Sequence, residues 1–157
     1  MENRKLAWII VIPLMIASIF LGSYTTYLQT TRRIEAAYRT EAEPVLNEKI
    51  QLLYNMITLH RLNNTDEVVL FNILQNMAEA QSQIENFEQV YVQILLSDAD
   101  VLFAVSSGFD EADARRMIGL YYDIRERAEI LRQTNYNNLA KEFNASILSN
   151  FGKLPTF

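Results

Sequence analysis

Residues Leu6–Leu28 read LAWIIVIPLMIASIFLGSYTTYL and contain no charged side chain. Of these 23 residues, 17 are Ala, Val, Ile, Leu, Met, Phe, Trp or Tyr. A helix of this length rises about 34 Å, which is enough to cross a hydrocarbon core of about 30 Å. We therefore predict one transmembrane helix here. It divides the chain into a short tail and anchor, residues 1–28, and a second domain, residues 29–157.

The flanks of this stretch are typical of a membrane span. Two basic residues stand on each side of it, and tyrosines lie near its second end, as in the aromatic belts of membrane helices. A cleaved signal peptide is the alternative, but the apolar run is long for one and no small-x-small cleavage site follows it. The flanking charges hardly favour either orientation. We expect a single-pass protein of the cell membrane with its carboxy-terminal domain outside the cytoplasm.

The composition of the 157-residue chain excludes several kinds of site. The absence of Cys excludes disulfides, thiolate metal sites and a Cys nucleophile, and a single His excludes a His-rich metal cluster. Four Gly residues form no phosphate-binding glycine motif. Residues 29–157 hold 12 basic and 18 acidic side chains, a net charge of −6. That balance argues against nonspecific binding to nucleic acid, whose phosphates would be repelled.

The middle of the chain has the spacing of a supercoiled helix. Capping residues Asn64-Thr65-Asp66 precede it and Ser106–Gly108 ends it. Its apolar residues recur at steps of three and four without interruption, a period of 3.5 residues. They are Leu70, Ile73, Met77, Ala80, Ile84, Phe87, Tyr91 and Ile94.

The last segment starts at Asp110, a good N-cap, and we expect Gly152 and Pro155 to end it. It carries two apolar stripes. The step of five residues from Leu131 to Tyr136 changes the phase between them, and a local adjustment of the supercoil would absorb it. The stripes are Met117, Tyr121, Ile124, Ala128 and Leu131, then Tyr136, Ala140, Phe143, Ile147 and Phe151.

The first segment continues from the span without a turn signal, and Pro44 either kinks it or opens a new helix. Three segments of 39, 41 and 42 residues result: Tyr24–Leu62, Asp66–Ser106 and Asp110–Phe151. We therefore predict an all-α fold, in which the span leads into an elongated antiparallel bundle of three long helices. A four-helix bundle broken at Pro44 is the alternative.

The three-helix prediction also orients the rod. The Ser106–Phe109 turn would return to the bilayer, because the first helix leaves the membrane and the second comes back. Asn63–Thr65 and the tail Lys153–Phe157 would then lie together at the far end. Leu154 and Phe157 would either be offered to a partner there or fold back onto the bundle.

The string RQTNYNNLAKEFNASI at residues 132–147 resembles the ending of bacterial LemA-family proteins. Tyr136-Asn137, Phe143-Asn144, Ile147 and Phe151-Gly152 fill the places of that ending, and the basic tail and single span also match the family. The resemblance covers about residues 104–152 and the anchor. The Leu-Ile-Pro-Asn-Leu-Val string of the family is absent, since residues 49–55 lack its Pro. The resemblance implies a long antiparallel helical bundle and brings no catalytic set.

Three groups of side chains are candidates for chemistry. His60 has no second ligand nearby in sequence, so a partly exposed residue at a helix end is favoured over a proton switch or ligand. The carboxylates around Ser106–Gly108 lack calcium-loop spacing, which favours capping over a calcium site. The arginines lie among acidic residues, which favours an ion-paired surface over a phosphate site. The carboxylates are those of Asp98, Asp100, Asp110, Glu111 and Asp113. The arginines are Arg115, Arg116, Arg125, Arg127 and Arg132.

Asn137 and Asn144 form a fourth candidate, because a spacing of seven places them on one helix edge. Hydrogen bonding between helices of the bundle is favoured over a polar strip for a partner helix. No acid–base pair, nucleophile or metal cluster stands out, so we predict no catalytic, cofactor or metal residues, and no enzyme.

The predicted function is a membrane-anchored interaction or scaffold protein of LemA-like type. Its partners would be the bilayer, through the span, and other membrane or envelope proteins, with homo-oligomers possible and nucleic acid excluded. The alternative is a ligand-sensing ectodomain that signals through a partner protein.

Overall fold

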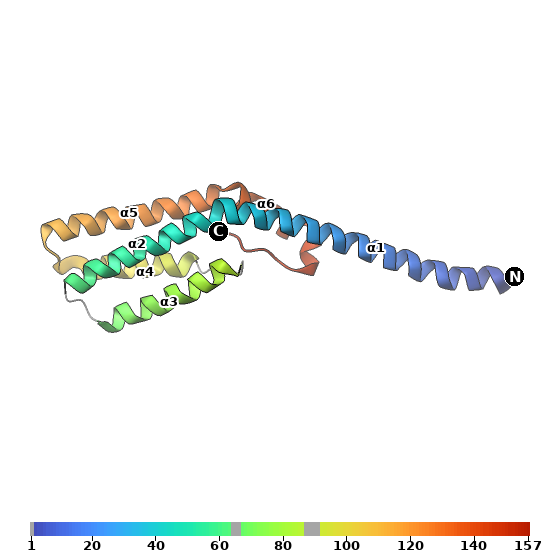
Figure 1. Ribbon diagram of the computed structural model, residues 1–157, viewed down its shortest axis with the longest axis horizontal. Helices are drawn as coiled ribbons and strands as arrows, with labels where there is room; N and C mark the ends of the chain where they lie inside the picture. Colours follow the sequence, from blue (N-terminus) through green and yellow to red (C-terminus); the bar gives the residue numbers. More distant parts are fainter. Residues whose placement is uncertain (1, 64–66, 87–91) are drawn as a thin grey trace.

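The computed structural model describes residues 2–63, 67–86 and 92–157. These residues form six α-helices and no β-strand (Figure 1). An all-α fold is therefore confirmed for the described part of the chain. The helices are α1 (Glu2–Ala37), α2 (Glu43–Leu62), α3 (Glu67–Glu85), α4 (Val92–Ala104), α5 (Glu111–Gln133) and α6 (Asn135–Ala145).

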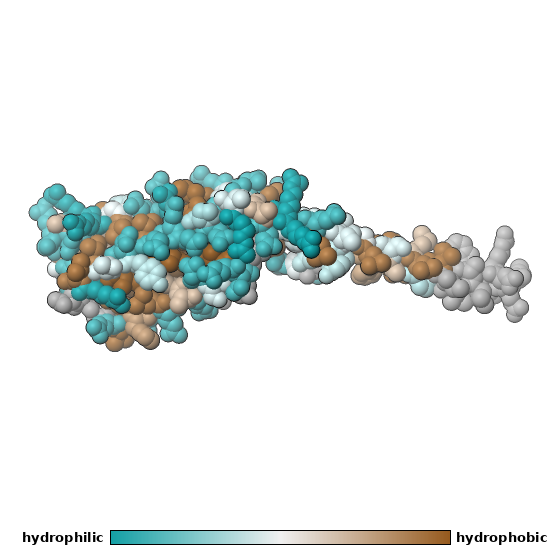
Figure 2. Space-filling model, in the orientation of Figure 1, coloured by the Kyte–Doolittle hydropathy of each residue, from teal (hydrophilic) through white to brown (hydrophobic). Residues whose placement is uncertain are grey.

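Helix α1 projects from the rest of the molecule and continues into α2 through a π-helical turn, Tyr38–Ala42. Every residue from 11 to 22 is exposed, and the space-filling view shows apolar side chains along this projection (Figure 2). Within the continuous helix Val11–Leu62, an 18-residue window has a mean hydropathy of 1.6 and is 0% buried. This helix is long and apolar enough to cross a membrane, as the sequence predicts.

Helices α3 and α4 lie side by side and run in opposite directions (Figure 1). The Nδ2 atom of Asn76 on α3 donates to both carboxylate oxygens of Asp98 on α4, at 3.2 Å. Along one straight helix, two residues 22 positions apart would lie about 33 Å from each other. The predicted 41-residue middle helix is therefore wrong, because the chain reverses between Glu85 and Val92.

The core stripe of the middle segment is confirmed where the structure describes it. Leu70, Ile73, Met77, Ala80 and Ile84 are all buried. Phe87 and Tyr91 of the predicted stripe lie outside the described residues, as do the predicted capping residues 64–66, and the side chain of Ile94 is not among those described.

The last segment is divided at Thr134, which adopts an extended conformation between α5 and α6. Its hydroxyl donates to the Leu131 carbonyl at 2.8 Å and accepts from the Asn137 N–H at 3.2 Å. The predicted 42-residue helix is therefore wrong. The five-residue step is absorbed by a capped break rather than by supercoiling. The predicted N-cap at Asp110 is confirmed, because its carboxylate accepts a hydrogen bond from the Asp113 N–H at 2.8 Å.

The bundle consists of α2, α3, α4 and α5, with successive helices antiparallel (Figure 1). The chain runs along the bundle four times instead of the predicted three. The Ser106–Gly108 turn and the carboxy-terminal tail therefore lie at the opposite ends of the bundle from those predicted. The turn at Ser106–Gly108 lies beside the end of α2, where Asn63 donates to Asp113 at 2.9 Å. The carboxy-terminal tail lies instead beside α1, where the position of a Cβ at Gly152 would be 3.1 Å from the Tyr27 hydroxyl. The predicted positions of the Ser106–Phe109 turn and of the tail are thus both wrong.

Candidate functional site at the junction of the span and the bundle

The π-helical turn Tyr38–Ala42 stands where the projecting helix enters the bundle. In this turn the N–H of Glu43 donates to the Tyr38 carbonyl, five residues back. Pro44 follows directly, near the amino end of α2. Proline lacks an N–H, and its ring collides with the carbonyl four residues earlier in a regular α-helix. A wider turn just before Pro44 suits this residue, and π-turns are frequent at functional sites.

One side of this turn caps the end of α3. The hydroxyl of Tyr38, which is fully buried, donates to the Ile84 carbonyl at 3.2 Å. The guanidinium of Arg39 donates to the Glu85 carbonyl at 2.9 Å. Both carbonyls belong to the last turn of α3, where no intrahelical donor remains. Burial raises the pKa of Tyr38, with Glu43 adding to the effect, so the hydroxyl remains a donor at neutral pH.

The other side of the turn caps the start of α6. The carboxylate of Glu41 accepts from the Tyr136 N–H at 3.0 Å. The rings of Tyr38 and Tyr136 meet edge to face, with their centroids 5.1 Å apart. Both aromatic rings are fully buried. The turn therefore joins the end of α3, the start of α6 and the exit of α1 in one cluster.

The carboxy-terminal tail lies along α6 and is held by side chains of that helix. The Tyr136 hydroxyl donates to the Pro155 carbonyl. Asn144 donates to the Leu154 carbonyl and accepts from the Leu154 N–H, both at 2.8 Å. Asn137 accepts from the Phe157 N–H at 2.8 Å and donates to the Arg132 carbonyl.

These contacts correct the prediction for the two asparagines. They share one edge of α6 as expected, and both bind the backbone of the tail, while Asn137 alone also bonds a helix of the bundle, through the Arg132 carbonyl of α5. Leu154 and Phe157 are partly buried against the core, so the fold-back alternative is the one observed. Ile147, predicted in the core stripe, is 81% exposed.

His60 lies at the far end of the bundle and is fully buried, which corrects the predicted partial exposure. Its Nε2 atom donates to the Leu102 carbonyl at 2.7 Å, and its ring meets the edge of the Phe109 ring with centroids 4.7 Å apart. Burial lowers the pKa of His60, against the opposing effect of this hydrogen bond. His60 therefore fastens α2 to the end of α4 and to the following loop.

The five predicted carboxylates do not converge on one point. Each has a separate partner, and no group of three or more His, Asp or Glu side chains able to hold a metal ion occurs among the described residues. Burial raises the pKa of Asp98, and donation from Asn76 opposes this. The partners are Asn76 for Asp98, Tyr121 and Arg125 for Asp100, the Asp113 N–H for Asp110, Arg115 for Glu111, and Asn63 and Arg116 for Asp113.

The five arginines are likewise each paired with a carboxylate. Arg127 on α5 pairs with Glu48 on α2 at 2.8 Å, and this ion pair joins two helices of the bundle. The other pairs are Arg115 with Glu111, Arg116 with Asp113, Arg125 with Asp100 and Arg132 with Glu129. The structure thus distributes these side chains over an ion-paired surface, as the sequence favoured.

Two surface grooves border these ion pairs. One, of about 360 Å³, lies along α2 and reaches Arg127 on α5. The other, of about 280 Å³, lies between α4 and α5 beside the contacts of Asp100 with Tyr121 and Arg125. In the second groove, donation from Tyr121 and Arg125 lowers the pKa of Asp100. That carboxylate stays ionised at neutral pH, which suits an ion pair rather than a general base.

Lys49 is a candidate that the sequence analysis missed. Its side chain is fully buried on α2, and its Nζ atom has no hydrogen-bond partner in the described part of the chain. Burial, with a smaller contribution from the charge of Arg132, lowers the pKa of Lys49 to about 8. The spacing of the sequence could have indicated this burial. Steps of three and four place Lys49 on one helix stripe with Leu46, Leu53, Met56 and His60.

Comparisons with protein-family models, with curated proteins and with solved structures find no match to this chain. The resemblance of residues 104–152 to the LemA family stays a prediction from the sequence. The interpretation of the junction therefore rests on its own geometry. It joins the projecting helix to the end of α3 and the start of α6 by three hydrogen bonds, an arrangement suited to holding position rather than to bond-making chemistry.

Proposed function

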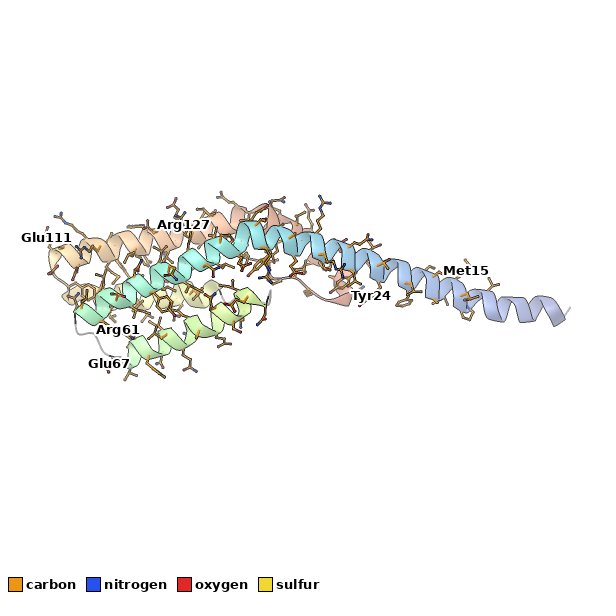
Figure 3. All side chains as sticks on the ribbon, viewed as in Figure 1. Met15, Tyr24, Arg61, Glu67, Glu111 and Arg127 are labelled. Atoms are coloured by element: carbon orange, nitrogen blue, oxygen red, sulfur yellow. The ribbon has the colours of Figure 1, made fainter. Side chains whose placement is uncertain are left out.

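We propose that this chain is a single-pass membrane protein whose helical bundle binds other proteins and performs no catalysis of its own. The observation that carries the proposal is an apolar tip at the end of the bundle farthest from α1. Leu62, Val68 and Phe71 stand on both sides of the α2–α3 connection and are 70%, 67% and 66% exposed. Arg61 and Glu67, labelled in Figure 3, mark this end of the two helices. Large apolar side chains gathered at an exposed site are typical of an interaction surface.

The position of this tip suits a partner held away from the bilayer. In this proposal the span anchors the chain, and the bundle extends away from the membrane along α2. The length of the bundle therefore separates the tip from the bilayer. The partners would be other membrane or envelope proteins, or a second copy of this chain. The net charge of −5 supports the exclusion of nucleic acid.

Two further parts of the proposal rest on the sequence. The flanking charges hardly favour either orientation, and a long carboxy-terminal domain can cross the membrane regardless of them, so we place the bundle outside the cytoplasm. The resemblance of residues 104–152 to LemA-family endings favours a LemA-like protein of bacterial type. Alkaline carbonate extraction of membranes tests the anchor, since an integral protein stays in the pellet and a peripheral one enters the wash.

Photo-crosslinking in native membranes tests the apolar tip. A photoreactive amino acid at position 71 should trap a defined partner, or a second copy of this chain, identified by mass spectrometry. The same amino acid at Gln75, which is exposed one turn along α3, should trap less of it, and at Asp123 on α5 it should trap none. Equal capture from all three positions would contradict a partner site at the tip.

A second function, ligand sensing through a partner protein, is favoured by one observation. The π-turn joins the projecting helix to α3 and α6 through Tyr38, Arg39 and Glu41, so a change in the bundle would act directly on the helix that enters the membrane. If this second function holds, a small molecule should raise the melting temperature of the detergent-solubilised protein. The Glu41→Gln variant should then weaken the response of the partner without removing binding.

A further inference from the structure

The turn that follows α6 lies against α1 at the level of Tyr27. Both α6 and the 3-10 segment Ile147–Phe151 that follows it pack beside α1 (Figure 1). The Tyr27 ring contacts the Phe143 ring, with centroids 5.9 Å apart. A Cβ at Gly152 would lie 3.1 Å from the Tyr27 hydroxyl. Residues 147–152, called the foot segment below, are therefore fixed at the depth of Tyr27.

The depth of Tyr27 follows from the length of the span. About 20 apolar residues cross a hydrocarbon core of about 30 Å. Counted from Leu6, the first residue after Arg4 and Lys5, they end near Thr25. The residues from 11 to 22 are exposed, and at Tyr27 helix α1 is half-buried against Phe143 and Gly152 of the carboxy-terminal region. The carboxy-terminal region thus first contacts α1 where the hydrocarbon core of the bilayer ends, at the depth of the lipid headgroups.

The foot segment carries the most exposed large apolar side chain of the described residues. Ile147 is 81% exposed, whereas its neighbour Leu148 is partly buried against the core. In water an isoleucine so exposed gains nothing from folding. At the membrane boundary the same side chain removes its apolar surface from water by entering the lipid.

Basic side chains accompany Ile147 at this end of the molecule. Lys153 follows the foot segment, and Arg32 and Arg33 lie on α1 just beyond Tyr27. All three are exposed, and none has an ion-pair partner within the described residues. Cationic side chains at the ends of a span contact the phosphates of lipid headgroups.

We propose that the foot segment binds the bilayer surface, with Ile147 inserted between lipid headgroups, as a second membrane contact beside the span. This inference rests on the proposed membrane anchor and adds to it. A single helix leaves the bundle free to rotate and tilt. A second contact, held to α1 through Tyr27 and Phe143, sets the orientation of the bundle, and so of its apolar tip, relative to the membrane.

Because the chain contains no Cys, single cysteines can be labelled uniquely in the full-length protein. An environment-sensitive dye is placed at Asn150 in the foot segment, at Ser107 at the far end of the bundle, and at Phe20 in the span. Vesicles of three parts phosphatidylcholine to one part phosphatidylglycerol carry lipids with a shallow nitroxide quencher. No other protein is present, so quenching reports lipid alone.

We expect quenching of the dye at Asn150 to be at least twofold stronger than at Ser107, and quenching at Phe20 to show that the span is inserted. Ile147→Asp should reduce the quenching at Asn150 at least twofold. Leu62→Asp, a matched change at a 70% exposed leucine of the distal tip, should leave it unchanged. Because Ile147 is so exposed, the substitution removes little from the folded protein.

The outcomes separate the two proposals. Quenching at Phe20 together with equal, weak quenching at Asn150 and Ser107 would overturn the foot contact and leave the anchor intact. The foot segment would then be a surface that binds a protein rather than lipid. Weak quenching at all three positions would overturn the anchor and with it the foot contact. Quenching at Asn150 that Ile147→Asp does not change would overturn the role of Ile147.

Discussion

Asn144 holds both polar groups of the Leu154 backbone with one side chain. Its Nδ2 atom donates to the Leu154 carbonyl and its Oδ1 atom accepts from the Leu154 N–H, each at 2.8 Å. The arrangement has the pattern of a strand pairing with a neighbour, yet an amide on a helix provides it. The tail is thereby fixed through its backbone, whatever side chains it carries.

Asn144→Ala should release the tail from α6. The change leaves the Leu154 N–H and carbonyl without their partner, and we expect a loss of roughly 1–3 kcal/mol in the free energy of unfolding. Hydrogen exchange of the detergent-solubilised protein should show faster exchange of the Leu154 amide. Asn137→Ala should speed exchange of the Phe157 amide in the same way.

Asn138 supplies the control for these two changes. It lies on the same helix and is exposed, so Asn138→Ala should alter stability by less than about 0.5 kcal/mol. If Asn144→Ala left exchange at Leu154 as slow as Asn138→Ala does, the side chain would not hold the tail.

Much of the core could be predicted from the sequence, because buried residues on helices recur at steps of three and four. Leu70, Ile73 and Met77 were found in this way, and Asp110 was found by its capping chemistry. The same rule hid the reversal between α3 and α4. In an antiparallel hairpin both helices turn their stripes to one core, so the spacing continues through the turn. Residues 85–92 contain no Gly or Pro to mark it.

The junction could not be predicted, because its contacts join residues far apart in the chain. Glu41 and Tyr136 are separated by 95 positions, and neither has an unusual local pattern. Lys49 was missed for another reason. Lysine is rarely buried without a partner, so its place on an apolar stripe was passed over. Ile147 shows the reverse error, since a residue in register with the stripe became exposed once α6 ended at Ala145.

Paired cysteines test the reversal directly. Asn76→Cys with Asp98→Cys should give a crosslink within one chain when a short thiol-specific reagent is added, because these side chains touch. Peptide mass spectrometry of the full-length protein in detergent identifies the product. Asn76→Cys with Asp123→Cys is the control, since Asp123 is exposed on α5. A continuous helix from residue 67 to residue 104 would give no product from the first pair.

Lys49 should make stability depend on pH in the alkaline range. Its pKa is about 8 in the folded chain, against 10.5 as the ordinary value. Between these values the unfolded chain binds more protons than the folded chain, so this lysine's contribution to the free energy of unfolding rises with pH. Below pH 8 both forms are charged, and the cost of burying the charge is constant.

Lys49→Met should therefore stabilise the protein at pH 7 by roughly 1–3 kcal/mol. The advantage over the wild type should shrink steadily between pH 8 and pH 10. Melting temperatures of the two proteins in detergent, compared at each pH, isolate this effect from the titration of tyrosines, which both proteins share. Lys141→Met, at an exposed position, should show neither the gain nor the pH dependence. A constant difference from pH 7 to pH 10 would mean that folding does not lower the pKa of Lys49.

Gly152 and Gly119 should respond to alanine with opposite signs. Gly152 has φ of 155°, and a Cβ there would lie 3.1 Å from the Tyr27 hydroxyl. Alanine strains the backbone and pushes the foot segment away from α1, at a cost of roughly 1–3 kcal/mol. Gly119 lies within α5 with no heavy atom within 4 Å of its Cβ position, so alanine should stabilise the helix by roughly 0.5–1 kcal/mol.

A double substitution separates the two causes at Gly152. Tyr27→Phe removes the hydroxyl that the new Cβ would meet, but it leaves the backbone strain. Gly152→Ala should therefore lower the melting temperature less in the Tyr27→Phe protein than in the wild type, but it should still lower it. The measurement is the melting temperature of the four proteins in one detergent. Full recovery would assign the whole effect to the contact with α1, and no recovery would mean that the foot segment does not pack on Tyr27.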